Sequence, residues 1–101
     1  MSEAYDLFQR GKENLRRGHP AEAVETLEQA RDLEPGKASI REALGIAYFR
    51  TRRWTDAEGE FRAMLEMAPT DGFAHRALAR SLASQGRDRE ANRHFKLAGS
   101  T

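Results

Sequence analysis

Apolar and small residues along the chain recur at three- and four-residue intervals, the spacing expected for one face of an amphipathic helix. Leu7, Gly11 and Leu15 follow this spacing near the N-terminus, and Leu44 and Tyr48 follow it further along the chain. Glycines, prolines and polar residues separate these stretches. The pattern predicts six helices, over residues 3–17, 21–34, 38–51, 56–68, 72–85 and 88–99.

The breaks between the helices predict turns of specific kinds. Gly18 and Gly86 follow helices in the manner of C-terminal caps, a place that favours glycine because the backbone there takes a positive φ. Arg52 occupies the equivalent place in the middle of the chain, so we expect a turn there that is strained or closed differently. Thr55 with Glu58 has the spacing of a capping box and predicts the start of the fourth helix.

An internal repeat appears when the sequence is shifted by 34 residues against itself. The shift places small residues on small residues and large apolar residues on large apolar ones. The sets that coincide are Ala23, Ala57 and Ala91, then Leu27, Phe61 and Phe95, and also Pro35 with Pro69. The chain therefore divides into three units, residues 4–37, 38–71 and 72–101.

The middle unit carries the signature that identifies the repeat. Its residues Leu44-Gly45, Tyr48, Ala57, Phe61 and Pro69 stand at the positions that define the tetratricopeptide repeat, although Met64 replaces the usual alanine. The chain thus resembles that family over nearly its whole length. The resemblance implies an all-α fold, a right-handed α-solenoid of three helix–turn–helix repeats with six helices. We expect residues 1–101 to form a single domain.

Composition agrees with a helical protein and narrows the function. More than half of the residues are Ala, Glu, Lys, Leu or Arg, and Val and Ile are scarce. Seventeen Lys and Arg balance sixteen Asp and Glu, so the net charge is +1 and the surface as a whole does not favour nucleic acid. There is no cysteine and no membrane-length apolar run, and we expect no signal peptide because the first residues are acidic and polar. These features predict a cytoplasmic protein with no membrane partner.

The resemblance also places one stripe of residues in the concave groove of the solenoid, which in this family lies along the first helix of each unit. Two bulky positions of the stripe, Leu15 and Phe49, are equally consistent with internal packing. With its rim, the predicted groove consists of Tyr5, Phe8, Lys12, Arg16, Ser39, Glu42, Ile46, Phe49, Arg50, Phe73, Arg76 and Arg80.

This set is locally basic although the protein is not. It holds five cationic side chains against one carboxylate, together with exposed-side aromatic residues. Arginine forks bind carboxylates at two points, and apolar pockets bind anchor side chains. We therefore predict a non-catalytic interaction module that binds an acidic peptide or segment of a partner protein. Two alternatives stay open: a solvated surface without a partner, and a groove filled by a second copy of the chain.

The best-known use of three such repeats is to bind the carboxylate at the end of chaperone tails. That use requires Asn and basic residues at fixed groove positions. Here Lys12 and Ala43 stand at the Asn positions, and Phe73 and Ala77 stand at the basic positions. We therefore do not expect chaperone-tail binding.

Other candidate chemistry is weak. His19, His75 and His94 have no recognisable metal-ligand spacing, and no phosphate loop or nucleophile motif is present. We expect no cofactor, no metal and no enzymatic activity. Trp54 stands where the family places an aromatic packing residue, so we interpret it as structural rather than as a nucleic-acid platform.

The last helix bears on self-association. Its residues Asn92, Lys96 and Gly99 lack the bulk of Val24 and Leu65 at matching places, which suits a helix that ends a stack. The apolar residues Phe95 and Leu97 nevertheless leave room for a homodimer. We predict a monomer or weak homodimer, with self-assembly through the groove or this helix as the alternative function.

Overall fold

The computed structural model describes residues 2–99 of the chain. In these residues it has no strand and six α-helices: α1 Glu3–Arg16, α2 Pro20–Leu33, α3 Ala38–Arg50, α4 Trp54–Met67, α5 Gly72–Ala83 and α6 Asp88–Gly99. The predicted all-α fold of six helices is confirmed, and each helix begins and ends within two residues of its predicted limits.

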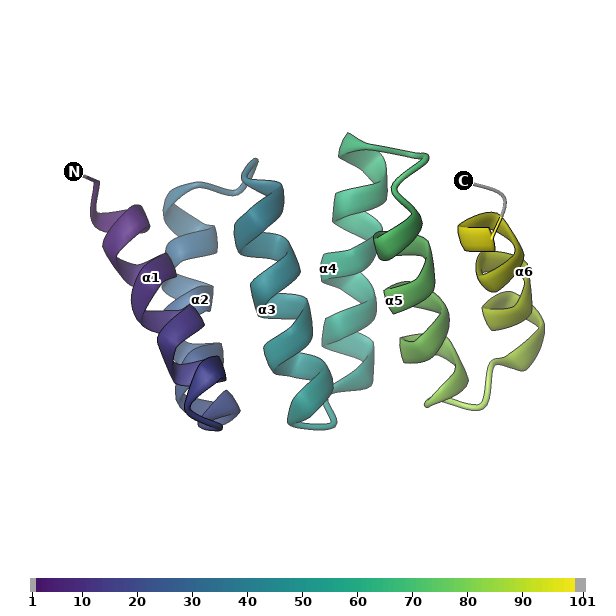
Figure 1. The fold of residues 1–101 in the computed structure, drawn as a ribbon, viewed down its shortest axis with the longest axis horizontal. Coiled ribbons are helices and arrows are strands. Elements are labelled where there is room, and N and C mark those ends of the chain that lie inside the picture. Colours follow the sequence, from purple (N-terminus) through teal and green to yellow (C-terminus); the bar gives the residue numbers. More distant parts are fainter. Residues whose placement is uncertain (1, 100–101) are drawn as a thin grey trace.

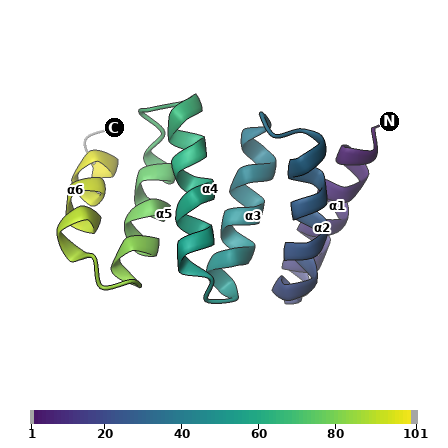
Figure 2. The same ribbon diagram turned by 180° about the vertical axis from the view of Figure 1, so that it is seen from behind.

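The helices follow one another along the long axis of the molecule, as Figure 1 shows, and the principal extents are 40 × 24 × 19 Å. Each helix packs against its neighbours in the sequence, and α1 also contacts α3. Helices α1, α3 and α5 lie toward the viewer in Figure 1, and α2 and α4 lie in front when the molecule is seen from behind in Figure 2. The first helices of the three units therefore share one side of the solenoid.

Small residues in the first helices let the second helices approach closely. A Cβ atom added at Gly11 would lie 2.4 Å from Leu27 Cγ, and one added at Gly45 would lie 2.5 Å from Phe61 Cε1. Leu27 and Phe61 are buried and belong to the hydrophobic core. Glycine is therefore required at both places, because any larger side chain would push the two helices apart.

The three turns inside the units share one conformation. Gly18, Arg52 and Gly86 have φ values of 80°, 63° and 77°, in the left-handed region. After each of them the next amide closes the helix, as when the Arg53 N–H donates to the Tyr48 carbonyl at 2.8 Å. Arg52 is the sole non-glycine residue with a positive φ in the described chain, so the strain predicted at this turn is confirmed.

The predicted capping box at Thr55 is wrong. Helix α4 begins at Trp54, so Thr55 is already its second residue, and the residue before the helix, Arg53, makes no side-chain cap. The tight turn at Arg52 returns the chain to helical geometry earlier than the capping pattern suggested. The Trp54 ring then packs edge-on against Phe49, with ring centroids 4.8 Å apart, in agreement with a structural role.

Candidate functional site

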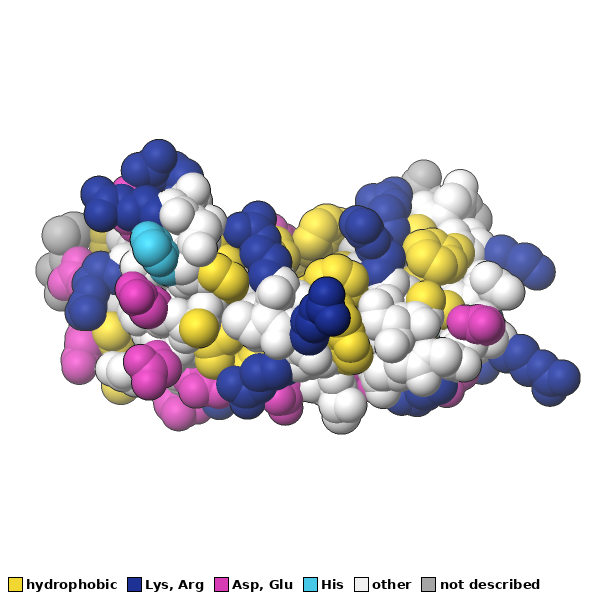
Figure 3. All heavy atoms as spheres, turned by 90° about the horizontal axis from the view of Figure 1, so that it is seen from below, with side chains coloured by type: hydrophobic (Ala, Val, Ile, Leu, Met, Phe, Trp, Pro, Cys, Tyr) yellow, Lys and Arg dark blue, Asp and Glu magenta, His cyan; other side chains and the backbone are white. Residues whose placement is uncertain are grey.

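Three adjoining depressions follow the side of the molecule formed by α1, α3 and α5. Two lie between α1 and α3, with volumes of about 320 and 410 Å³, and the third, of about 520 Å³, lies between α3 and α5. Phe8 and Ser39 line both of the first two, and Ile46 lines the second and the third, so the three form one continuous groove. Figure 3 shows the molecule hollowed between two higher ends, with hydrophobic side chains in the hollow and Lys and Arg beside it.

Most of the residues predicted for the groove line it. Those that do are Tyr5, Phe8, Lys12, Ser39, Glu42, Ile46, Phe49, Arg50, Phe73, Arg76 and Arg80. Arg16 lies apart from the three depressions, and its guanidinium instead bonds Glu13, with Nε 2.9 Å from Oε2. This hydrogen bond is the largest cause that lowers the pKa of Glu13 to about 2. Arg16 is therefore a neutralised surface residue.

The depression between α3 and α5, which we call the α3–α5 pocket, has an apolar floor. Ile46, Phe49, Phe61, Phe73 and Ala77 contribute its hydrophobic side chains. The Phe61 ring reaches the floor from α4 and meets Phe73 edge-on, with centroids 6.3 Å apart. Phe73 is 40% exposed, so a large part of its ring is open to a ligand.

Two pocket residues, Phe61 and Ala77, were absent from the predicted set. Phe61 is a packing residue of α4, since only 2% of its surface is exposed. Its ring also reaches the opposite side because Gly45 has no side chain to block it. The residue in the sequence that indicates this is Gly45, because the absence of a side chain there leaves room for the Phe61 ring to reach the pocket.

Three arginines surround the pocket without a carboxylate partner. Arg50 Nη1 donates to the Leu15 carbonyl at 3.1 Å, and the Arg80 guanidinium lies 5.9 Å from the centroid of the Phe49 ring. Arg76 is exposed and, within residues 2–99, its side chain makes neither a hydrogen bond nor an ion pair. Among the described residues that line this pocket there is no Asp or Glu. The pocket therefore combines apolar surface with uncompensated positive charge.

The rest of the groove is close to neutral. Lys12 Nζ lies 4.5 Å from the centroid of the Phe8 ring, and Glu42 lines the same depression. Lys37 and Glu34 balance each other in the depression nearest the N-terminus. The positive charge predicted for the whole groove is thus concentrated at its α3–α5 end.

Arginines between the repeats, in contrast, are paired with the buried carboxylate of Glu60 or the partly buried carboxylate of Glu58. Glu60 is 6% exposed and accepts hydrogen bonds from Arg31 of the first repeat and Arg41 of the second, each at 3.0 Å. Glu58 accepts from Arg62 and from Arg87 of the third repeat, each at 2.9 Å. These carboxylates join successive repeats.

Burial and the neighbouring hydrogen-bond donors shift the pKa of Glu58 in opposite directions. Burial alone would raise its pKa, but hydrogen bonds from Gln85 and Arg62, together with the charges of Arg62 and Arg87, lower it below the usual value of 4.5. Glu58 is therefore ionised at neutral pH, and its charge is used inside the protein. Tyr48 shows the effect of burial on a neutral group: burial, followed by its bond to Glu28, raises its pKa to about 12.

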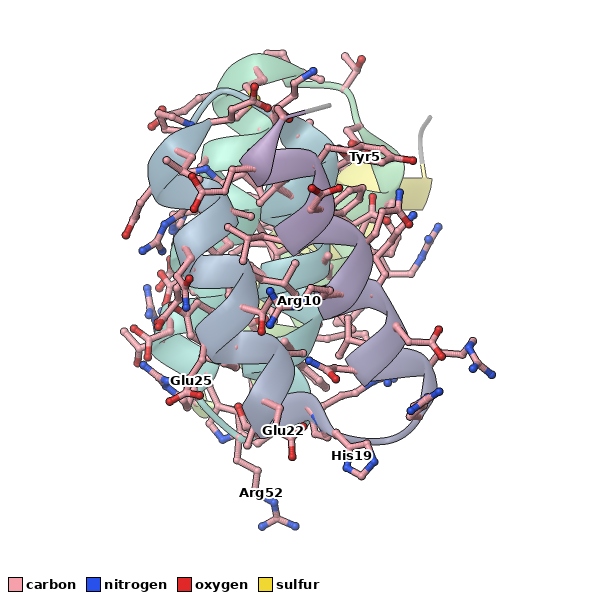
Figure 4. The ribbon with its side chains drawn as sticks, turned by 90° about the vertical axis from the view of Figure 1, so that its left-hand side faces the viewer. Tyr5, Arg10, His19, Glu22, Glu25 and Arg52 are labelled. Carbon is pink, nitrogen blue, oxygen red and sulfur yellow. The ribbon has the colours of Figure 1, made fainter. Side chains whose placement is uncertain are left out.

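At the end of the solenoid formed by α1 and α2, acidic side chains of α2 lie away from the groove. Figure 4 looks at this end and shows the Tyr5 ring on the side of α1, away from Glu22 and Glu25 on α2. His19 and Arg52 lie at the lower edge, at the turns. The acidic side chains of α2 are therefore separated from the groove by the helix pair itself.

Two of the three histidines contact each other. His75 Nδ1 lies 3.0 Å from His94 Nδ1, a contact that the sequence did not suggest because the residues lie on different helices. His19 remains alone in its turn. No group of three or more His, Cys, Asp or Glu side chains in the described part of the chain is placed to hold a metal ion.

The model of the tetratricopeptide repeat family matches residues 8–72, which is more than half of the chain. The chain belongs to the tetratricopeptide repeat family. Solved structures with the same tetratricopeptide fold include MamA AMB-1, with a TM-score of 0.92 and 28% identity over 98% of this chain. Another is the second TPR of Spaghetti (RPAP3), bound to the HSP90 peptide SRMEEVD, with a TM-score of 0.88 and 16% identity over 96% of this chain.

The chain corresponds to part of one neighbour and to nearly all of the other. It covers 54% of the MamA AMB-1 chain and 90% of the RPAP3 domain. No curated protein sequence matches it significantly. Each tetratricopeptide helix in residues 2–99 is too short or too polar to cross a membrane.

Proposed function

We propose that this tetratricopeptide domain is an interaction module whose groove binds an extended or helical segment of a partner protein. The acidic part of that segment lies at the α3–α5 pocket, and a large apolar side chain enters the pocket between Phe49 and Phe73. The observation that carries the proposal is the apolar floor surrounded by Arg50, Arg76 and Arg80 without an intramolecular carboxylate.

The magnitudes indicate that both halves of the pocket are needed. Burial of one aliphatic or aromatic side chain contributes about 1.5–3 kcal/mol. A micromolar complex requires about 8 kcal/mol. Hydrogen bonds between a guanidinium and a carboxylate contribute about 1.5–3 kcal/mol each when they are shielded from water. The anchor alone therefore falls well short of micromolar affinity even before the cost of association is subtracted, so the flanking carboxylates are needed as well.

The structural neighbours support a protein or peptide ligand, but they do not identify which one. The RPAP3 domain is bound to a peptide that ends in Glu-Glu-Val-Asp, and it shares the fold of this chain at low identity. In the present chain Ala43, Phe73 and Ala77 replace the polar and basic side chains that bind such a tail. We therefore propose a ligand with internal acidic residues and an apolar anchor, rather than a chaperone tail.

The proposal includes no catalytic step. The described residues around the α3–α5 pocket provide guanidinium and hydrocarbon groups, and neither serves as a general base or a nucleophile at neutral pH. Binding and release of the partner segment are then the whole activity of the site.

The test uses a fluorescent peptide with a central Phe flanked by two Glu on each side, compared with peptides flanked by Gln or Lys. We expect the Glu peptide to bind most tightly, and Arg76→Glu with Arg80→Glu to weaken it by at least about tenfold. The matched control is Arg89→Glu with Arg93→Glu, which places the same charge change at the same spacing on α6. Equal loss in the two double variants, or equal binding of the three peptides, would contradict the proposal.

A second candidate function, self-assembly through α6, rests on one observation. Phe95 is 41% exposed, whereas its counterparts Leu27 and Phe61 are buried. Light scattering over a range of protein concentrations tests this candidate. It requires a species larger than a monomer that disappears in the Phe95→Gln variant.

A further inference from the structure

The third repeat holds a histidine pair where the second repeat holds an ion pair. In the second repeat, Arg41 Nη1 donates to Glu60 Oε1 at 3.0 Å and Arg41 Nε donates to the Pro35 carbonyl at 3.0 Å. The places 34 residues later are His75, His94 and Pro69. His75 Nδ1 lies 3.0 Å from His94 Nδ1, and His75 Nε2 lies 2.8 Å from the Pro69 carbonyl. The same contacts are thus made by two imidazoles in place of a guanidinium and a carboxylate.

The contact with Pro69 fixes which nitrogen of His75 carries its proton. A carbonyl oxygen only accepts, so His75 Nε2 must be the donor at 2.8 Å. In the neutral ring His75 Nδ1 is then an acceptor, and His94 Nδ1 must donate to it. The ring centroids are 5.2 Å apart and the ring planes are inclined by 23°, so the two Nδ1 atoms face each other.

A proton on both rings at once is incompatible with this arrangement. His75 is 7% exposed and both of its ring nitrogens are engaged, so protonation of both rings would place a hydrogen on each Nδ1 at a separation of 3.0 Å. The bond would be lost and two cations would face each other. Protonation of His94 on its Nε2 retains the bond but adds a charge to a partly buried ring.

The charged groups around the pair mostly oppose that added charge. Burial is the main cause that lowers the pKa of His94, and His75 of α5, Arg62 of α4 and Arg93 of α6 lower it further. Glu90 of α6 acts in the opposite direction. The unfolded chain therefore binds a proton at His94 more readily than the folded chain does. The stability from this group is present above about pH 6.5 and is lost as the pH falls below that value.

The position of the histidine pair determines which part of the α5–α6 hairpin loosens when the contact is lost. His75 lies in the first turn of α5 and His94 in the second half of α6, so they join the two helices at the end opposite their turn. The other end of the hairpin is held by the turn and by Glu58, which accepts from Gln85 and Arg87. Loss of the histidine contact therefore affects the outer half of α6 most.

We propose that His75 and His94 form a pH-sensitive contact that holds α6 against α5, so that mild acid loosens the last hairpin while the first two repeats stay closed. The second repeat holds Arg41 and Glu60 at the matching places, with no histidine there, which confines the response to one end of the solenoid. The inference does not depend on the proposed peptide ligand.

The test is hydrogen exchange at about pH 7.5 and about pH 5.5, expressed as protection factors so that the intrinsic pH dependence of exchange is removed. We expect protection in α6 to fall by about tenfold at the lower pH, and protection in α2 to change little. The decisive variant is His75→Arg with His94→Glu, which gives the third repeat the pair that the second already uses. It should remove the pH response of α6, whereas His19→Gln should leave that response intact.

Nitrogen NMR of the wild-type imidazoles provides a second readout that does not require a variant to fold. We expect a proton on His75 Nε2 and on His94 Nδ1 at about pH 7.5, with the His94 midpoint below its ordinary value. Equal loss of protection in α2 and α6, or an unchanged response in the Arg/Glu variant, would overturn the proposal. The opposite tautomers would do so as well.

Discussion

The arginines between the repeats and the arginines around the α3–α5 pocket differ in what neutralises them. Arg31 and Arg41 are mostly buried and share the carboxylate of Glu60. Arg76 and Arg80 lie on the open side of α5, and no carboxylate lines their pocket in the described chain. One residue type therefore joins the repeats in the first region and leaves charge available to a ligand in the second.

The comparison explains how a protein of net charge +1 presents a strongly positive pocket. Its carboxylates are not spread evenly, because Glu58 and Glu60 are used between repeats. Charge counted over the whole chain consequently says little about the field that a ligand meets. The division also predicts that substitutions in the first region change stability and those in the second change binding.

The largest effect on stability is expected from Glu60→Ala. This change leaves two partly buried arginines without their carboxylate, and removal of one partner from a buried ionic group typically costs about 3 kcal/mol or more. Urea denaturation should show the free energy of unfolding lowered by about 3 kcal/mol. The matched control is Glu13→Ala, an exposed residue that bonds Arg16, and it should leave the denaturation midpoint unchanged. Equal effects of the two changes would remove the distinction between buried and exposed pairs.

A smaller loss is expected from Glu58→Gln, and it should depend on pH. The change weakens charge-assisted bonds from Arg62 and Arg87 and should lower the free energy of unfolding by about 1–2 kcal/mol at pH 7. Because the pKa of Glu58 is lowered in the folded protein, its contribution is present above about pH 4.5 and is lost as the pH falls below that value. The difference between variant and wild type should therefore shrink in acid, and a constant difference would contradict the role of its charge.

Arg52→Gly should stabilise the protein by about 1 kcal/mol. The φ of 63° is costly for a residue with a side chain and free for glycine, which occupies the equivalent turns of the other two repeats. The rise in thermal midpoint should persist at high salt, since the gain comes from the backbone and not from charge. A gain that vanishes in salt would instead indicate repulsion among the neighbouring arginines.

The smallest effect on stability is expected from Arg76→Ala. Its side chain is exposed and has no intramolecular partner in the described chain, so the free energy of unfolding should change by less than about 0.5 kcal/mol. Denaturation in parallel with Glu60→Ala gives the sharpest contrast between the two regions. If Arg76→Ala lowered the free energy of unfolding nearly as much as Glu60→Ala does, Arg76 would have a structural role.

Much of the fold followed from the sequence because packing repeats with the chain. Gly11 faces Leu27 in the first repeat, and 34 residues later Gly45 faces Phe61 in the same way. The capping box at Thr55 failed because a local pattern was outweighed by the turn at Arg52. Local signals of this kind compete with one another, and the tertiary structure determines which one is used.

The candidate site was harder to predict, since it depends on pairs of residues from different helices. The sequence indicates basic residues near the groove, but it does not show that Arg16 is taken by Glu13 whereas Arg76 is free. The contact between His75 and His94 was missed for the same reason. The repeat register does contain a clue, because it aligns this pair with Arg41 and Glu60, a charged pair of opposite sign.

Mapping of amide chemical shifts during titration with the Phe-centred acidic peptide tests the role of the α3–α5 pocket most directly. We expect the largest changes at Ile46, Phe49, Phe73 and Ala77, little change on α2, and loss of these changes when Arg76 and Arg80 are both replaced by Glu. Shifts confined to α2 or α6, or the same shifts in the charge-reversed protein, would show that the pocket and its arginines are not where the partner binds.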